Sequence, residues 1–325
     1  MKILTFDIGG ANTKKLLYDS ESGNILKNEI YYFPFWREFR DFPTFLSKLR
    51  ENASKVGFVF TAELSDAFRT KREGIDFLLE VCSSIFPEAR FMDIDQRLLG
   101  YKEVKKTLNL AAANYAASLY YLERNFGEGV LLDIGSTTTD IIPFRHGEKL
   151  YAKNDLDRML AGQLLYHGCL RTPLSAIACE INFRGGRIKP ASEFFAITAD
   201  IYNILGEIEN YSCETPDGRD KNHVESMQRV ARMLCSDFDE LGEDEIVKLC
   251  EAFREVQIDS IKYNVKRVME DFKIDRVFLA GIGDFLGRRV CSRLKVEFKL
   301  LKEVTEVYNN LPCLGLAEAL NDEGD

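Results

Sequence analysis

The chain has 325 residues, of which 46% are hydrophobic and 29% charged, and its formal net charge is -9 at pH 7. This composition is that of a globular protein and excludes a disordered chain. The acidic balance argues against a nucleic-acid partner, which would require a clustered basic surface. A chain of this length commonly divides into two packed lobes.

Neither a secretory signal nor a membrane-spanning segment is expected. The N-terminal residues lead directly into an apolar strand. The most apolar helical stretch, residues 108–122, is too short to cross a bilayer. Eight cysteines are scattered without Cys-x-x-Cys spacing, so they predict neither a zinc ribbon nor a dithiol motif. We therefore expect a cytoplasmic protein with reduced thiols and no membrane partner.

Helices and strands are predicted to alternate along the chain after an N-terminal strand. In chain order the predicted elements are a helix (45–52), a strand (56–61), a helix (75–84), a strand (90–93), a helix (109–124), an irregular region (155–233), a long helix with Asp244 as N-cap that runs to Phe272, and a strand ending in a glycine turn (276–284). This alternation predicts an α/β protein.

The first candidate site is the segment ILTFDIGGANTK, residues 3–14, which is typical of a strand, a tight turn and a second strand. Glycine lets the backbone approach a phosphate closely, and successive N–H groups can then point at the anion. Asn12 and Thr13 add donors, Lys14 can neutralise charge, and Asp7 is suited to hold Mg²⁺ or its waters. Taken alone, the segment also fits an ordinary β-hairpin.

A second copy of this pattern is VLLDIGSTTTD, residues 130–140. Its run of hydroxyl residues is poor as a helix, and we interpret it as a set of donors around a phosphate. Asp133 is again placed for a metal, and Asp140 is a candidate supporting acid or base. Two such loops, one from each lobe, predict a phosphate clamp across a cleft. The predicted phosphate-binding residues are Gly9, Gly10, Asn12, Thr13, Lys14, Gly135, Ser136, Thr137 and Thr138.

Further candidates for the cleft come from three places in the chain. The segment AGIGD, residues 280–284, is a strand-to-helix glycine turn suited to a nucleotide or another flat group, and it also fits a plain connection. Arg171 is a candidate to hold a substrate carboxylate bidentately, and Lys71 to reach a phosphate from the first lobe. The predicted cleft residues are Gly281, Gly283, Asp284, Arg171 and Lys71.

The N-terminal hairpin, the central hairpin and the late glycine turn (residues 280–284), in this order, resemble the actin and sugar-kinase superfamily. The C-terminal segment CLGLAEAL, residues 313–320, is similar to the helix that returns to the first lobe there. The resemblance implies a two-lobed, ribonuclease H-like α/β fold with a nucleotide and Mg²⁺ in the cleft between the lobes. We predict a first lobe of residues 1–108 and 312–325, and a second lobe of residues 109–311.

A closer resemblance covers nearly the whole chain. It is carried by FTAELSDAF (60–68), KREG (71–74), LDIGSTTTDIIP (132–143), RTP (171–173), FAITADIY (195–202) and RMLC (232–235). These segments resemble the archaeal hydantoinase/oxoprolinase-like family of methanofuran biosynthesis, formerly described as predicted kinases of one-carbon metabolism. The resemblance implies a transferase that joins an aminomethyl-furan-methyl diphosphate to the phenol oxygen of γ-glutamyltyramine. An aryl ether forms and pyrophosphate leaves.

Such a reaction needs a base for the phenol proton. The candidates are Glu63, Asp66, Asp140 and Asp200. We prefer Asp140, because it directly follows the hydroxyl run, and we expect it to act with Asp7 and Asp133. Mg²⁺ held by Asp7 and Asp133 is the expected cofactor, and a small phosphorylated molecule is the expected partner.

Three alternatives remain at this stage. They are an ATP-dependent small-molecule kinase, a non-catalytic nucleotide-binding regulator and a 5-oxoprolinase-like hydrolase. The two loops alone do not separate ATP from another diphosphate, since both present the same anionic groups.

Overall fold

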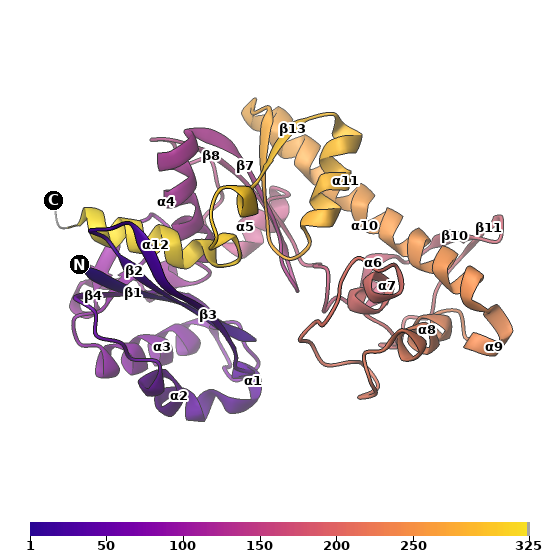
Figure 1. The fold of residues 1–325 in the computed structure, drawn as a ribbon, viewed down its shortest axis with the longest axis horizontal. Coiled ribbons are helices and arrows are strands. Elements are labelled where there is room, and N and C mark those ends of the chain that lie inside the picture. Colours follow the sequence, from indigo (N-terminus) through magenta and orange to yellow (C-terminus); the bar gives the residue numbers. More distant parts are fainter. Residues whose placement is uncertain (324–325) are drawn as a thin grey trace.

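The computed structural model describes residues 1–323 and contains two main β-sheets flanked by helices (Figure 1). The first sheet has six strands in the order β3-β2-β1-β4-β5-β6. Its strands are β1 (Lys2–Gly9), β2 (Asn12–Asp19), β3 (Asn24–Tyr32), β4 (Lys55–Thr61), β5 (Arg90–Met92) and β6 (Leu98–Gly100). Because β1 is parallel to β4, their carboxyl ends lie at the same edge, where Gly9 pairs with Thr61.

The second sheet has five strands in the order β13-β12-β7-β8-β9. Its strands are β7 (Glu128–Ile134), β8 (Thr139–Arg145), β9 (Leu164–Leu165), β12 (Arg276–Ala280) and β13 (Glu297–Leu300). The short strands β10 (Ile181–Phe183) and β11 (Gly186–Ile188) form a separate antiparallel pair. Each main sheet contains one of the two antiparallel hairpins predicted from the sequence, β1–β2 in the first and β7–β8 in the second.

Twelve α-helices lie within residues 1–323. They are α1 (Phe35–Glu38), α2 (Phe42–Lys48), α3 (Lys71–Ile85), α4 (Asn114–Phe126), α5 (Asp155–Leu160), α6 (Leu174–Ile177), α7 (Thr198–Ile204), α8 (His223–Arg232), α9 (Phe238–Leu241), α10 (Glu243–Phe272), α11 (Asp284–Leu294) and α12 (Leu311–Asp322). Five short 3₁₀ helices complete the described chain: Phe39–Asp41, Tyr101–Glu103, Thr107–Leu110, Leu301–Glu303 and Tyr308–Asn310. None of these helices is long and apolar enough to cross a membrane.

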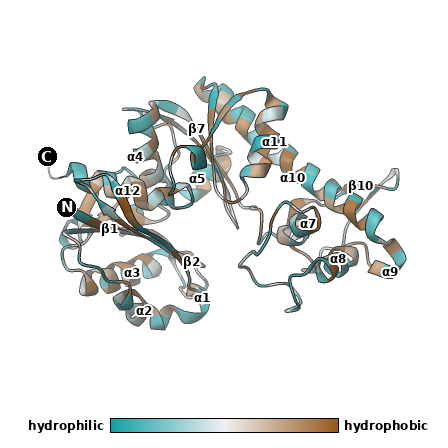
Figure 2. Cartoon of the chain, in the orientation of Figure 1, coloured by the Kyte–Doolittle hydropathy of each residue, from teal (hydrophilic) through white to brown (hydrophobic). Residues whose placement is uncertain are grey.

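Strand β1 is buried on both faces, and its alternation sorts its side chains between two cores. Leu4, Phe6 and Ile8 belong to an aromatic-rich core shared with α2 and α3. The opposite face turns toward α12, where the Thr5 hydroxyl donates to the carbonyl of Cys313 at 2.9 Å. Because side chains alternate along a strand, Asp7 lies on the same face of β1 as Thr5. Figure 2 shows the apolar residues gathered along β1, β7 and α12.

Helices α4 and α12 connect the two sheets. Helix α12 packs against β1 and β4, and α4 packs against β4, β7 and β8. The two helices approach so closely that a Cβ on Gly315 would overlap the carbonyl oxygen of Ala117. The lobe boundaries proposed from the sequence stay a prediction, because α4 contacts strands of both sheets. Residues 324 and 325, at the end of the predicted first lobe, lie outside the described residues.

The α/β class and the two-hairpin pattern are confirmed, and four predicted details are wrong. The helix predicted over residues 45–52 is α2, which begins at Phe42 and ends at Lys48. The long helix has Gly242 as its N-cap instead of Asp244, which lies in the acidic first turn. The helix predicted over residues 109–124 begins at Asn114, because Ala112 has a positive φ of 51° that interrupts helical geometry. The region predicted to be irregular contains four short helices, α5 to α8.

Candidate active site

The two hairpins place acidic residues at equivalent positions. In the first hairpin Asp7 of β1 lies opposite Lys14 of β2. In the second hairpin Asp133 of β7 lies opposite Asp140 of β8. Each aspartate comes just before its turn, so each hairpin holds a carboxylate beside a loop of small polar residues. The lysine of one hairpin therefore corresponds to an acid in the other.

Charges from both hairpins act on one another. The Lys14 ammonium lies 3.6 Å from a carboxylate oxygen of Asp7. Burial lowers the pKa of Lys14, but the negative charges of Asp7 and Asp133 favour its charged form, and the pKa of Lys14 is raised overall. Burial raises the pKa of Asp133 to about 6, with a further contribution from Asp140 and an opposing one from Lys14. Lys14 is therefore paired with Asp7, and the charge of Asp133 on the other sheet also favours its charged form.

Asp7 is the most enclosed of these acids, with 4% of its surface exposed. Burial raises its pKa, and Lys14 acts in the opposite direction. Its Oδ1 atom has no hydrogen-bond partner within residues 1–323. A buried, partnerless carboxylate oxygen is costly and suggests a ligand or ion that completes the site.

A chain of ion pairs runs from Asp140 to the other lobe. Asp140 accepts a hydrogen bond from the guanidinium of Arg158 on α5. Arg158 is buried, contacts Asp155 at 3.3 Å, and lies over the Tyr115 ring at 4.3 Å. Asp155 in turn contacts the Lys71 ammonium on α3 at 3.3 Å. The predicted cleft residue Lys71 thus bridges to the α5 helix.

The loop of the second hairpin is held in place by its own backbone. The Gly135 N–H donates to the Thr138 carbonyl at 2.9 Å, and the Ser136 and Thr137 hydroxyls lie 3.2 Å apart. Ser136, Thr137 and Thr138 are partly exposed, as a phosphate-binding role requires. Thr139 is different, since it is buried and its hydroxyl donates to the His167 carbonyl at 2.8 Å.

The loop of the first hairpin is also accessible for most of its length. Gly9, Gly10, Asn12 and Lys14 are all partly exposed. Thr13 is fully buried, and its hydroxyl has no partner within the described part of the chain. The predicted phosphate-binding residues therefore line two loops, with Thr13 beneath the first.

The glycine turn after β12 packs directly on the second hairpin. Gly281 has a φ of +82°, and a Cβ there would overlap the Ile134 carbonyl oxygen and the Asp133 carboxylate. The Gly283 N–H donates to the Ile134 carbonyl at 2.9 Å. Asp284 begins α11 and pairs with Arg288 at 3.7 Å. The turn thus fixes the backbone that presents Asp133.

Arg171 contacts both the second hairpin loop and α1. Its guanidinium is 5.1 Å from the centre of the Trp36 ring on α1, a cation–π contact. The backbone N–H of Arg171 donates to the Ser136 carbonyl at 2.9 Å. Arg37, next to Trp36, lies 3.6 Å from Glu214 of the second lobe. Arg171 therefore links the second hairpin loop to α1.

The acidic pair can be tested against the Mg²⁺ expected from the sequence. Within residues 1–323 no three His, Cys, Asp or Glu side chains gather as a metal cage. Protein-bound Mg²⁺ commonly uses only one or two carboxylates together with substrate phosphates and water. Asp7, with its partnerless Oδ1, and Asp133 form a donor set of that kind. The residues fit a Mg²⁺ that binds together with a phosphorylated ligand.

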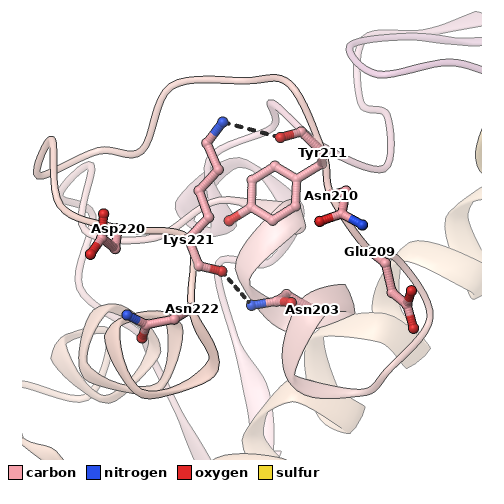
Figure 3. Close-up of a pocket in the computed structure, with 7 residues that line it drawn as sticks. All are labelled: Asn203, Glu209, Asn210, Tyr211, Asp220, Lys221 and Asn222. Atoms are coloured by element: carbon pink, nitrogen blue, oxygen red, sulfur yellow. Dashed lines mark hydrogen bonds between the residues drawn. The ribbon is translucent and has the colours of Figure 1, made fainter.

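A polar pocket of about 720 Å³ lies away from the hairpins, near α7 and α8 (Figure 3). It is lined by Asn203, Glu209, Asn210, Tyr211, Asp220, Lys221 and Asn222. Lys221 donates to the Tyr211 carbonyl at 3.1 Å, and Asn203 donates to the Lys221 carbonyl at 3.0 Å. Its lining contains none of the residues of the two hairpins, so the pocket is not part of the candidate active site.

The fold, with its paired hairpins, is that of actin-like and sugar-kinase-like proteins. A ROK-family glucokinase from Streptomyces griseus, solved with glucose and AMPPNP, matches with a TM-score of 0.50 at 10% identity, covering 98% of each chain. Nucleotide-free acetone carboxylase matches with a TM-score of 0.58 at 10% identity, covering 98% of this chain and 70% of that one. At such low identity these likenesses concern the fold alone.

The chain belongs to the hydantoinase/oxoprolinase family, which it matches over residues 55–323. It is 35% identical over 312 residues to the (4-{4-[2-(γ-L-glutamylamino)ethyl]phenoxymethyl}furan-2-yl)methanamine synthase of Methanocaldococcus jannaschii, covering 94% of this chain and 89% of that protein. It is 39% identical over 167 residues to the synthase of the same name from Methanococcus vannielii, covering 51% of this chain and 75% of that protein. The family resemblance inferred from the sequence is thereby confirmed.

Proposed function

We propose that this chain forms the aryl ether for which its relatives are named. The relatives' product contains a phenoxymethyl link between a γ-glutamylaminoethyl-phenol and an aminomethyl furan. Forming that link requires γ-glutamyltyramine as acceptor and a furan-methyl donor with a good leaving group. A diphosphate is the leaving group that suits two loops of small polar residues with a lysine between them. The carrying observation is the first hairpin, where Lys14 pairs with Asp7 at 3.6 Å beside the loop, together with the second hairpin, which places Asp133 in the equivalent position.

The hairpins are proposed to hold the diphosphate while its bond to the furan methylene breaks. Negative charge then grows on the departing oxygen, and donors already aimed at that charge lower the barrier. Lys14, the Ser136, Thr137 and Thr138 hydroxyls and the loop N–H groups supply such donors. Asp7 and Asp133 would hold Mg²⁺, which adds positive charge beside the phosphates when it is bound. The electron-rich furan can carry positive charge on its methylene carbon.

The remaining predicted residues have supporting roles in this proposal. Gly281 and Gly283 fix the backbone behind Asp133. Arg171 and Lys71 lie at contacts between the lobes and would hold them around the substrates. Asp284, paired with Arg288, is proposed to support the start of α11 beside the same turn.

The setting proposed for this reaction is the cytoplasm, with small molecules as the only partners. Within residues 1–323 all eight cysteines are free, and six of them are buried. Free thiols are the usual state in a reducing compartment. This supports the placement without fixing it.

The test is a mass-spectrometric assay of the purified protein with Mg²⁺ and γ-glutamyltyramine. One reaction contains the aminomethyl-furan-methyl diphosphate and the other contains ATP. We expect the ether and one pyrophosphate per ether in the first reaction, with both lost in Asp133→Asn. A phosphorylated acceptor with ADP in the second reaction, and no ether in the first, would favour a kinase instead.

A further inference from the structure

Glu63 carries a buried carboxylate that is not part of the two phosphate-binding loops and has no role in the proposed function so far. It follows β4 by two residues, and the last residue of β4, Thr61, pairs with Gly9 of the first hairpin. The chain therefore carries Glu63 to the same edge of the sheet as the first loop. The side chain is 2% exposed, and its Oε2 atom has no hydrogen-bond partner within residues 1–323.

The backbone around Glu63 is held tightly. A Cβ added to Gly74 of α3 would lie 2.7 Å from the Glu63 carbonyl oxygen, so α3 packs directly against this segment. Ala112, whose backbone N–H acts to lower the pKa of Glu63, has a φ of +51°. A left-handed alanine is strained by about 1–2 kcal/mol and persists only where its surroundings impose it. Such strain is often found beside functional groups.

The charges around Glu63 favour its taking up a proton. The pKa of Glu63 is raised to about 7, mainly by burial; its own backbone N–H and Lys71 of α3 act to lower it, and Asp155 of α5 acts to raise it. Asp155 and Lys71 are themselves paired at 3.3 Å. The carboxyl is therefore poised to change its protonation state near neutral pH, which suits a general base.

Asp140, the base preferred from the sequence, has a different environment. Its carboxylate accepts a hydrogen bond from Arg158, which is itself buried and also contacts Asp155. Because its carboxylate is already occupied by this guanidinium, we assign Asp140 to positioning Arg158.

We propose that Glu63 is the general base that removes the phenol proton of the acceptor, an inference that rests on the proposed ether-forming function. The phenol proton passes to the Glu63 carboxylate. The electron pair on the phenol oxygen forms the new bond to the furan methylene carbon. The bond between that carbon and the diphosphate oxygen breaks, and its electron pair leaves with the diphosphate.

The first experiment compares Glu63→Gln with wild type and with Glu80→Gln, a matched change at an exposed site on α3. We expect Glu63→Gln to lower kcat/KM for ether formation by about 100- to 10,000-fold. Glu80→Gln should stay within about twofold of wild type, as surface substitutions usually do. Calorimetric binding of inorganic pyrophosphate should be the same in all three proteins, which shows that the site is folded and the phosphate loops are intact.

A second acceptor separates a base from a merely structural residue. γ-Glutamyl-3,5-difluorotyramine has a more acidic phenol and depends less on a base, so the deficit of Glu63→Gln should shrink by at least about tenfold. In addition, kcat/KM of wild type should fall below a pH of about 7, as Glu63 becomes protonated. That acidic limb should be missing from Glu63→Gln.

Two results would overturn the inference alone. One is a Glu63→Gln enzyme that couples as fast as wild type, and the other is an equal deficit with both phenols. In both cases the wild type still forms the ether, so the proposed function stands. A wild type that forms no ether with either acceptor would overturn the proposed function and the inference with it.

Discussion

The contact between Gly281 and the second hairpin gives a quantitative prediction. Gly281 has a φ of +82°, and a Cβ there would overlap the Ile134 carbonyl oxygen and lie 2.6 Å from the Ile134 carbonyl carbon. Gly23, in the turn between β2 and β3, has a similar φ of +72° but nothing within 4 Å of an added Cβ. Alanine at either position carries a left-handed penalty of about 1–2 kcal/mol. Only at Gly281 does overpacking add about 1–3 kcal/mol more.

We therefore expect Gly23→Ala to lower the free energy of unfolding by about 1 kcal/mol and Gly281→Ala by about 3 kcal/mol or more. Urea denaturation at pH 7 measures both. Ether formation, measured in parallel, should be unchanged in Gly23→Ala and reduced in folded Gly281→Ala, because Asp133 is displaced. Equal losses of stability in the two variants would refute the claim that the turn packs tightly on the hairpin.

Three further expectations follow from single contacts. Gly315→Ala should destabilise the protein by about 3 kcal/mol or more in urea denaturation, because its Cβ would overlap the Ala117 carbonyl oxygen and force α12 from α4; an unchanged midpoint would contradict this packing. The pKa of Glu63 is about 7 in the folded protein against 4.5 for a free glutamate, so the wild-type free energy of unfolding should fall by about 3 kcal/mol as the pH rises from 4.5 to 7. Glu63→Gln should not show this fall, and a stability difference between the two proteins that is the same at pH 4.5 and pH 8 would argue against the burial of Glu63. Trp36 is the only tryptophan and lies 5.1 Å from the Arg171 guanidinium, so Arg171→Ala should change its emission, and identical spectra would exclude the contact.

The hairpins could be predicted because their signal is local. Asp7 and Asp133 each follow an apolar run and precede glycine and small polar residues, a pattern that specifies a strand and a tight turn without help from distant contacts. The local pattern was less informative at Thr139, because the run of four hydroxyl residues suggested that all four share one role as donors around a phosphate. Thr139 begins β8 and points to the buried side, toward the His167 carbonyl.

The ion pairs that connect the lobes could not be read from the sequence. Lys71 and Asp155 are 84 residues apart, and their 3.3 Å contact depends on how α3 and α5 are packed. Asp140 was preferred as a base because of its place after the loop, and its neighbour Arg158 is brought close by the fold. Glu63 was one candidate among four in the sequence, and only its burial and free Oε2 distinguish it.

The central claim is that this chain transfers a furan-methyl group and not a phosphoryl group. The most direct test uses a furan-methyl diphosphate in which oxygen-18 bridges the methylene carbon and the phosphorus. Alkyl transfer breaks the carbon–oxygen bond, so we expect the label in pyrophosphate and none in the ether, with γ-glutamyltyramine as acceptor. Oxygen-18 left in the furan alcohol, together with a phosphorylated acceptor, would mean that the phosphorus–oxygen bond had broken and would contradict the account.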